Sequence, residues 1–255
     1  MNDSTADDAL ARWHRAHAAA SMVGWDFSRL DGRMTADEPW WDFERDCRKA
    51  LATSSSALDL GTGGGERLIQ LLEQTPERGV VHATEGWAPN VEVARANLAP
   101  LGVEVRPYDA EAGDRLPYDD GSMDLVMSRH EAIDPAEVVR VLTPGGRLLT
   151  QQVHGLDAPE IHEWFGAAYE YPHVTAERFV ADLEAAGLRI DAVDDWTGTM
   201  EFADVEALVT YLGLVPWDAP DFTVEDHAEA LLALDAARPI KVTQRRFRIH
   251  AHKES

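Results

Sequence analysis

Short apolar runs alternate with amphipathic segments between residue 57 and about residue 153. The apolar runs have the length and composition of buried strands, and they fall at 57–60, 80–85, 103–108, 123–128 and 147–153. The segments between them carry apolar residues at helical spacing, as at 67–73 and 137–142. Strands and helices that alternate in this way form βαβ units, so we expect an α/β fold with a mostly parallel sheet.

The flanking parts of the chain predict further elements. Thr175 is a suitable N-cap for a helix over 176–186, and Gly187 is a suitable residue to end it. A helix is also expected to begin near Pro39, because proline is favoured in the first turn of a helix. The remaining expected elements are a helix at 8–20, a strand at 188–193, helices at 205–211 and 224–236, and a last strand at 241–251.

A glycine-rich segment follows the first of these strands directly. The strand ends in Asp59-Leu60, and the chain continues Gly61-Thr62-Gly63-Gly64-Gly65-Glu66 before the helix at 67–73. Glycine allows positive φ and a close approach of the backbone, and such a turn lies where α/β sheets bind ligands. The spacing is G-x-G-x-G and has Glu66 at the sixth position, which argues against the fingerprint of dinucleotide-binding dehydrogenases.

Acidic residues follow the next two strands. Glu85 ends the second strand and lies 24 residues after Gly61, close to the offset at which an acid meets a ribose hydroxyl pair. A carboxylate accepts two hydrogen bonds at once and repels a 2′-phosphate, which disfavours NADP. Asp109-Ala110-Glu111 follows the third strand, and a Pro-Gly-Gly turn at 144–146 precedes the fifth.

These four landmarks, in this order, resemble the class I S-adenosylmethionine (SAM) dependent methyltransferases, in particular the methyltransferase type 11-like domain. The resemblance covers about residues 55–153 and implies a Rossmann-like, seven-stranded, mostly parallel sheet with an antiparallel last strand and helices on both faces. It also implies an N-terminal helical cap at 1–52 and a SAM-binding domain at 53–255, with a lid-like helical insertion at about 203–238 before the last strand.

The resemblance also implies which residues bind SAM or its product S-adenosylhomocysteine. Backbone groups of the glycine loop approach the methionine part and the ribose, Asp59 orients the loop, Glu85 binds the ribose hydroxyls, and Asp109 accepts from the adenine amino group. The full set of implied cofactor residues is Asp59, Gly61, Thr62, Gly63, Gly65, Glu85, Gly86, Trp87, Asp109, Ala110, Glu111 and Ser128.

Candidates for catalysis lie after the fourth and fifth strands. His130 is a candidate general base because the pKa of an unperturbed imidazole lies near neutrality, although it could equally hydrogen-bond the cofactor or the backbone. Glu131 and His154 compete for the same role. Aromatic residues suit an apolar acceptor pocket or plain packing, and the substrate candidates are Trp25, Trp40, Tyr169, Tyr171 and Trp217.

Charge and composition limit the partners. The chain of 255 residues has a net charge of −23, which repels nucleic-acid backbones, and its basic run Arg245-Arg246-Phe247-Arg248 is expected to form a solvated strand edge. No run of 18 apolar residues and no signal peptide is found, so we expect neither membrane binding nor secretion. The one cysteine, Cys47, fits a reducing cytoplasm and is a poor nucleophile in its charged helical surroundings. No metal-binding acid set is present in the sequence.

The function expected from this pattern is methyl transfer from SAM to an O or N atom of a small-molecule metabolite or natural product. The protein is expected to act as a monomer or homodimer. Two alternatives stay open, an RNA- or protein-directed methyltransferase and a SAM-binding module without catalysis. The segment Ser128-Arg129-His130-Glu131 carries none of the Asn/Asp-Pro-Pro-Tyr motif of amino-directed nucleic-acid enzymes.

Overall fold

The chain forms two compact units in a computed structural model that describes residues 3–22 and 26–254, with side chains from residue 6 onward. Unit 1 comprises residues 1–39, 155–173 and 196–245, and unit 2 comprises 40–154, 174–195 and 246–255. The expected division was a boundary at residue 52 and an insertion at 203–238. The two units instead place 40–52 with the sheet domain and add 155–173 to unit 1.

One mixed sheet forms the framework of the fold, and its strands among the described residues follow the order β1-β7-β8-β6-β5-β2-β3-β4. The pairs β3–β4, β2–β3, β2–β5 and β5–β6 are parallel, whereas β6–β8 and β1–β7 are antiparallel. The bounds are β1 Met34–Ala36, β2 Ser56–Leu60, β3 Val80–Glu85, β4 Glu104–Pro107, β5 Met123–Arg129, β6 Leu142–Val153, β7 Leu188–Phe202 and β8 Ile240–Lys253.

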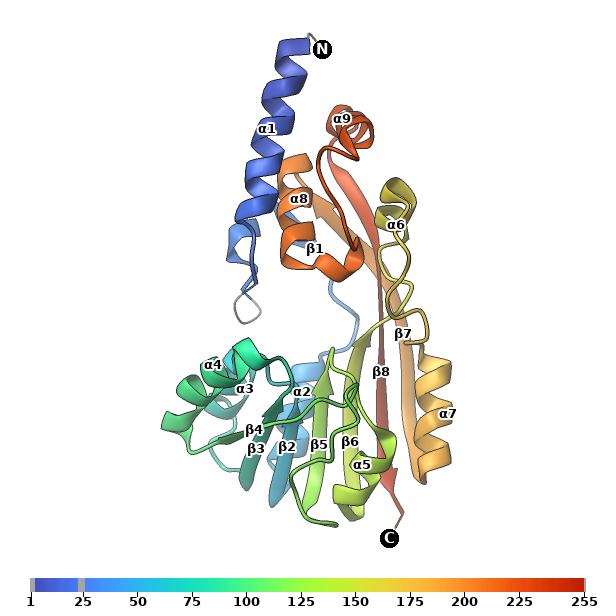
Figure 1. The fold of residues 1–255 in the computed structure, drawn as a ribbon. Coiled ribbons are helices and arrows are strands. Elements are labelled where there is room, and N and C mark those ends of the chain that lie inside the picture. The colour runs from blue at the N-terminus through green and yellow to red at the C-terminus, as the bar shows by residue number, and fades with distance from the viewer. Residues whose placement is uncertain (1–2, 23–25, 255) are drawn as a thin grey trace. The chain divides into compact units, whose positions relative to one another are not determined.

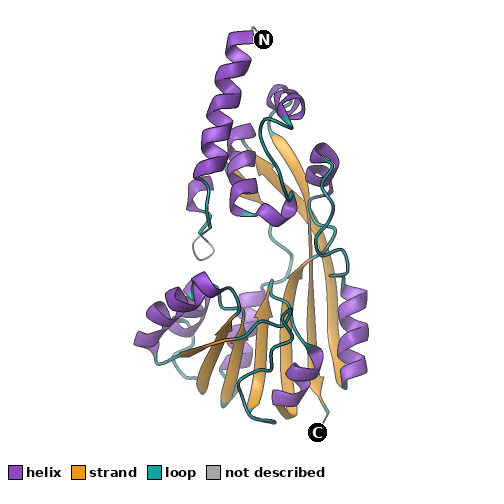
Figure 2. Ribbon diagram, viewed as in Figure 1, coloured by secondary structure: helices purple, strands orange, loops and turns teal. Residues whose placement is uncertain are grey.

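Helices cover both faces of the sheet in unit 2, which confirms the expected α/β architecture (Figures 1 and 2). Residues of α5 and α7 share a buried core with β2, β5, β6 and β8, whereas α2 contacts α3 and β5. The helices are α1 Asp3–Ala19, α2 Phe43–Leu51, α3 Glu66–Glu73, α4 Ala88–Leu98, α5 Pro135–Val141, α6 Pro159–Phe165, α7 Ala176–Ala186, α8 Val205–Leu214 and α9 Ala228–Ala236. Short 3-10 turns lie at Ser28–Leu30, Ala99–Leu101 and Pro216–Asp218.

Capping residues set several helix ends. Thr175 accepts a hydrogen bond from the amide of Arg178, and Gly187 ends α7 in the left-handed conformation, as the sequence predicted. The expected start near Pro39 is wrong. Asp42 caps α2 by accepting from the amide of Arg45, so the helix begins only at Phe43. A side-chain cap satisfies a free amide, which a proline before the helix cannot do.

The sheet differs from the expected seven strands by one short addition. Met34–Ala36 pairs with residues 200–202 of β7, so an eighth strand lies at the edge beside the seven that were expected. β7 is also longer than the expected 188–193. From residue 189 to residue 199 its side chains alternate between exposed and half-buried. The sequence therefore contains no long apolar run that would predict the full strand.

The basic run at 245–248 does not form a solvated edge, contrary to expectation. β8 lies between β7 and β6, and the Arg248 side chain is only 13% exposed. It donates to Asp194 at 2.8 Å and also pairs with Asp46. The guanidinium further lies over the ring of Trp41 at 5.3 Å. A partly buried arginine of this kind is retained because its carboxylate partners compensate its charge.

Unit 1 has its own apolar core. Trp13 of α1 and Phe202 of β7 are fully buried in it, together with apolar residues of α6, α8 and α9. Arg33 links the segment before β1 to the start of α8, because its guanidinium donates to Asp204 at 2.7 Å and to Glu206 at 2.9 Å. No helix in the described part of the chain is both long and apolar enough to cross a bilayer.

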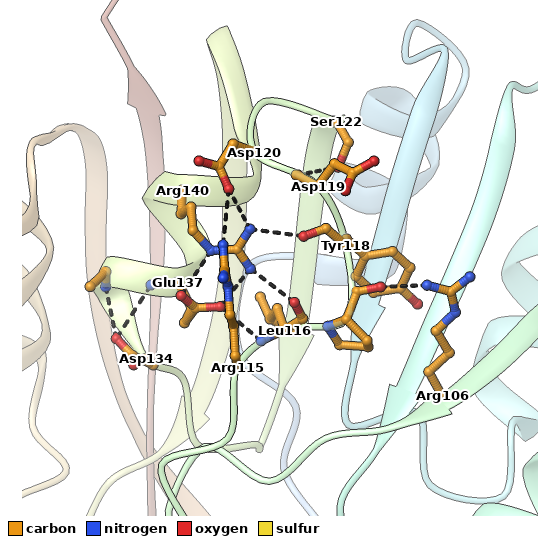
Figure 3. A network of polar contacts seen from close by, with 12 residues as sticks. Arg106, Arg115, Leu116, Tyr118, Asp119, Asp120, Ser122, Asp134, Glu137 and Arg140 are labelled. Carbon is orange, nitrogen blue, oxygen red and sulfur yellow. Dashed lines mark hydrogen bonds and ion pairs between the residues drawn. The ribbon is translucent and has the colours of Figure 1, made fainter.

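A polar network in unit 2 holds the loop before β5 against α5 (Figure 3). The Arg140 guanidinium donates to Glu137 and Asp120 and to the carbonyl oxygens of Leu116 and Tyr118, at 2.6 to 2.9 Å. A hollow of about 480 Å³ lies beside this network, next to the N-terminal end of β5. It is lined by His82 of β3, Arg106 of β4 and the loop before β5, and Arg106 is already paired with Glu104. We therefore assign this hollow no ligand.

Candidate cofactor and active site

The glycine loop connects β2 to α3 with a backbone that only glycine adopts easily. Gly61, Gly63 and Gly65 have φ values of +68°, +63° and +89°. A Cβ on Gly61 would lie 2.3 Å from Cγ of Glu131, so the Glu131 side chain lies directly on this glycine. A Cβ on Gly65 would instead meet Leu98 of α4 at 2.9 Å. Gly61 thus borders the candidate site, and Gly65 permits close packing of α3 and α4.

Glu85 joins the end of β3 to the glycine loop. Its Oε2 accepts from the amide of Gly63 at 2.7 Å, and its Oε1 accepts from the amide of Trp87 at 2.9 Å. Each carboxylate oxygen can accept a further hydrogen bond, so two acceptor positions are left for a ligand hydroxyl pair. A Cβ on Gly86 would lie 2.8 Å from the Tyr108 carbonyl oxygen, which places the end of β4 beside Glu85.

Asp109 forms a turn at the end of β4. Its Oδ1 accepts from the amides of Glu111 and Ala112 at 2.9 and 3.1 Å, and its own amide donates to Asp114. This turn directs the Asp109-Ala110-Glu111 backbone around one carboxylate oxygen. The sequence-predicted residues Gly61, Gly63, Glu85 and Asp109 are thus brought together along one edge of the sheet.

Three carboxyl groups near the loop have raised pKa values. Burial raises the pKa of Glu131 to about 8, and the negative charges of Glu85, Asp109 and Glu111 add to the effect. Burial also raises the pKa of Asp59 to about 7, with a contribution from Glu85. The pKa of Glu85 is raised by burial as well, against the hydrogen bonds from backbone amides. Like charges crowded at one buried place favour a cationic ligand.

The end of β5 carries the second group of polar residues. Ser128 is fully buried and lies 3.4 Å from the Glu131 carbonyl oxygen, which also accepts from the Gln152 side chain at 2.9 Å. His130 has a φ of +60°, which is uncommon for a residue with a side chain. Its Nε2 lies 3.3 Å from Nε2 of Gln151, and burial together with nearby arginines lowers its pKa well below the usual value.

Comparison with known proteins agrees with this geometry. Residues 57–146 match the family model described as a methyltransferase domain, which covers the glycine loop, Glu85, Asp109 and the Pro-Gly-Gly turn. This chain carries a class I SAM-dependent methyltransferase domain.

Two curated relatives match over part of their length. The chain is 31% identical over 167 residues to the release factor glutamine methyltransferase of Mycolicibacterium smegmatis, covering 60% of this chain and 59% of that protein. It is 33% identical over 147 residues to the demethylmenaquinone methyltransferase of Deinococcus radiodurans, covering 51% of this chain and 58% of that protein. The chain therefore spans just under three fifths of the length of these two relatives.

A solved structure shares the fold of most of the chain. A proposed methyltransferase from Bacillus halodurans superposes with a TM-score of 0.59 at 21% identity, covering 84% of this chain and 99% of that one. At this level of identity the likeness concerns the fold alone.

The residues of the methyltransferase domain fit SAM. The buried hydroxyl of Thr62 lies beside the Asp59 carboxyl, and its hydrogen bond opposes the rise of the Asp59 pKa that burial causes. Raised carboxyl pKa values at Asp59 and Glu131 complement the cationic ammonium and sulfonium groups of SAM. Trp87 is 48% exposed beside Glu85, so its contact with adenine stays a prediction.

The roles of the other predicted site residues stay predictions. His154 packs edge-on against Phe247 of β8 at 6.4 Å and lies near Glu177 of α7 and Asp195 of β7. Trp40 is 68% exposed and lies over Arg248 at 5.2 Å. The remaining substrate candidates Tyr169, Tyr171 and Trp217 belong to unit 1, and their role stays a prediction. Trp25 lies outside the described residues.

Two residues of the site were missed by the sequence interpretation. Gln151 and Trp41 are both 5% exposed, and they hydrogen-bond each other beside His130. Nothing in the sequence joins positions 41 and 151, although the polar pair Gln151-Gln152 inside an apolar strand was a usable signal.

Cys47 is buried, and burial raises the pKa of its thiol well above the usual value, in agreement with an unreactive cysteine. Among the described residues, no group of three or more histidine, cysteine or acidic side chains is arranged to hold a metal ion.

Proposed function

We propose that this chain is a cytoplasmic enzyme that transfers a methyl group from SAM to an O or N atom of a small molecule. The observation that carries the proposal is the cluster of buried carboxyls around the glycine loop, where Glu131 lies on Gly61 and Glu85 binds Gly63. Burial, with the charges of neighbouring acids, raises the pKa of Glu131, and such a buried acid cluster favours a bound cation.

The cofactor roles follow from the contacts of these residues. Glu85 presents two acceptor positions to the ribose hydroxyls, and the turn at Asp109 and Ala110 receives the adenine. The backbone at Gly61 and Gly63, with Thr62, borders the methionine part. When bound, SAM supplies an electrophilic methyl group on a positively charged sulfur. The protein's part is to orient the two reactants and exclude water, which suits a site with few exposed polar groups.

A small-molecule acceptor is supported by charge and by one relative. The net charge of −23 opposes a nucleic-acid substrate, because binding to a phosphate backbone depends on clustered basic residues. The relative from Deinococcus radiodurans is named for methylation of demethylmenaquinone, which is a quinone and not a macromolecule. A protein acceptor is the second candidate, since the relative from Mycolicibacterium smegmatis is named for glutamine methylation of a release factor. We propose that the enzyme acts as a monomer or homodimer.

Cofactor binding is tested by thermal shift with SAM, S-adenosylhomocysteine and NAD in parallel. A ligand at about 100 times its dissociation constant stabilises by about 2.7 kcal/mol, which raises the melting temperature of a domain of this size by roughly 5–10 °C. We expect a shift with SAM and S-adenosylhomocysteine and none with NAD. A shift with NAD alone contradicts the proposal, and methylation of a peptide in place of small acceptors selects the second candidate.

The role of Glu85 is tested with a matched variant on the neighbouring strand. Glu85→Gln keeps the shape of the side chain but removes the charge and one acceptor, so SAM binding should weaken about 10- to 100-fold, or about 1.4–2.7 kcal/mol. Glu104→Gln on β4 alters a carboxyl that is paired with Arg106 at the surface and should leave affinity unchanged. Calorimetric titration with SAM measures both. Equal affinities in the two variants would refute the assignment of Glu85.

A further inference from the structure

A chain of hydrogen bonds connects three side chains at the end of β5. The indole N–H of Trp41 donates to Oε1 of Gln151 at 2.7 Å, and Nε2 of the same amide lies 3.3 Å from Nε2 of His130. The His130 amide also donates to the Gln151 carbonyl oxygen at 2.8 Å. Trp41 precedes α2, Gln151 lies in β6, and all three residues belong to unit 2.

The direction of this chain is set by its first member. An indole N–H can only donate, so the Gln151 oxygen must face Trp41 and the Gln151 amino group must face His130. Gln151 is 5% exposed, and its backbone is paired in the interior of the sheet between Arg129 and Arg248. A reversed amide would set two donors against each other at Trp41 in a place with little access to water.

The tautomer of the His130 ring follows from the orientation of the Gln151 side-chain amide. An amino group donates, so Nε2 of His130 has to be the accepting, unprotonated nitrogen, and the ring proton of the neutral imidazole resides on Nδ1. The charged imidazolium is disfavoured by burial and by the positive charges of Arg129, Arg246 and Arg67. It would also direct a second N–H at the Gln151 amino group.

We propose that Trp41 and Gln151 are positioning residues that hold His130 as the neutral Nδ1–H tautomer, so that its available ring nitrogen donates a hydrogen bond. His130 is then a donor to an oxygen of the methyl acceptor, such as a carbonyl or carboxylate beside the reacting atom, in place of the general base first considered. This consequence for the acceptor rests on the proposed methyl transfer, whereas the tautomer does not.

The backbone at His130 agrees with a residue placed for a purpose. Its φ of +60° lies in the left-handed region, where a side chain costs conformational energy that the surrounding contacts have to supply. The hydrogen bond from the His130 backbone amide to the Gln151 carbonyl oxygen holds this conformation. Gln151 therefore fixes both the backbone and the ring of His130.

The experiment is long-range proton–nitrogen NMR of the full chain labelled with nitrogen-15 in histidine. The His130 signals are identified by their loss in His130→Asn, because asparagine tolerates the left-handed conformation. We expect a protonated Nδ1 and an unprotonated Nε2 that stay unchanged between pH 6 and 8. A ring with the proton on Nε2, or one that titrates as an imidazolium in that interval, overturns the proposal.

Two variants separate positioning from mere packing. Gln151→Glu replaces the donor by an acceptor and should move the ring proton to Nε2 and raise the pKa of His130. Trp41→Phe removes the indole donor, frees the amide to reverse and should give a mixture of tautomers. Trp40→Phe alters the exposed neighbour and is the control without effect. If both Gln151→Glu and Trp41→Phe keep the ring proton of His130 on Nδ1, the proposal is refuted. If either variant fails to fold, the wild-type spectrum still decides.

The outcomes for the tautomer and for the proposed function are distinguishable. The NMR signals report the tautomer without any turnover, and the thermal shift with SAM reports the cofactor. An Nδ1–H ring in a chain that does not bind SAM would refute the function and leave the positioning role intact. A chain that binds SAM but carries the proton on Nε2 would do the reverse.

Discussion

Two clusters of charged groups in unit 2 are built on opposite principles. Around Arg140, carboxylates and carbonyl oxygens surround one guanidinium at hydrogen-bond distance, and the pKa values of Glu137 and Asp120 are lowered mainly by their bonds to it (Figure 3). Around Gly61, carboxyls gather with one another, and the pKa values of Asp59 and Glu131 are raised by burial and by neighbouring acids. The first cluster is complete in itself, whereas the second is electrostatically favourable only with a cation added.

This contrast indicates which of the two clusters is suited to a ligand. A balanced network stabilises the fold and leaves no demand for a ligand, so the hollow beside Arg140 gives no indication of binding in spite of its size. An unbalanced and buried acid cluster costs folding free energy, and proteins keep such clusters where a ligand compensates them. We therefore expect a ligand at the glycine loop, whereas the Arg140 network holds a neighbouring loop in place.

The largest expected effect concerns the balanced cluster. Arg140→Met leaves Glu137 and two carbonyl oxygens without their donor in a partly buried place, so the free energy of unfolding should fall by roughly 2–4 kcal/mol. Arg115→Met removes a contact to the same Asp120 from a side chain that is 72% exposed, and should change stability by at most about 0.5 kcal/mol. Urea denaturation measures both. Equal losses would show that the network is not cooperative around Arg140.

A smaller effect is expected at the glycine loop. Gly61→Ala places a Cβ 2.3 Å from Glu131 and forces alanine to a φ of +68°, which together should destabilise the fold by about 2 kcal/mol and weaken SAM binding. Gly113→Ala has a similar φ of +75° with nothing within 4 Å, so it isolates the backbone cost of about 1 kcal/mol. Gly61→Ala should thus lose about 1 kcal/mol more stability than Gly113→Ala, and adding Glu131→Ala should recover this excess. If the double variant does not recover it, the close contact with Glu131 is not its cause.

The smallest effect is a dependence of stability on pH. Glu131 has an ordinary pKa of about 4.5 when unfolded and a raised pKa of about 8 when folded, so the native state binds more protons between these values. Stability should therefore fall as pH rises from about 4.5 to about 8. Glu131→Gln cannot titrate and should flatten this fall, so the variant should gain stability relative to the wild type at pH 8.

The matching control has a pKa shift of opposite sign. The pKa of Glu104 is lowered by its bond to Arg106, so Glu104→Gln should not flatten the fall of stability between pH 4.5 and 8. Thermal melts at several pH values without cofactor measure both variants. An unchanged slope in Glu131→Gln would show that the acid cluster is less coupled than its contacts indicate.

Local signals in the sequence predicted many of the elements and the cofactor edge. The hydroxyl of Thr175 and the missing side chain of Gly187 define α7 through contacts within a few residues, so they act in the same way wherever the helix lies. Glu85 also followed from its offset, because it ends the strand next to β2 in a parallel sheet. Its bond to Gly63 is the consequence of that pairing.

Contacts between distant segments were not predictable from single residues. Met34–Ala36 is a strand only because the edge of β7 offers its unpaired backbone. Arg248 can be partly buried only because Asp46 and Asp194 approach it from other elements. The hydrogen bond between Trp41 and Gln151 spans more than a hundred residues of chain. No periodicity encodes such a pair.

The α/β order of elements, the glycine loop and the acids at the strand ends were predictable from the sequence, because periodicity, capping and turn chemistry depend on neighbours along the chain. The pKa values and hydrogen-bond partners of those groups depend on the tertiary structure. Burial and packing, which no residue has in isolation, raise the pKa of Glu131 over Gly61 and lower that of His130. They also give Gln151 the partners that fix the His130 ring.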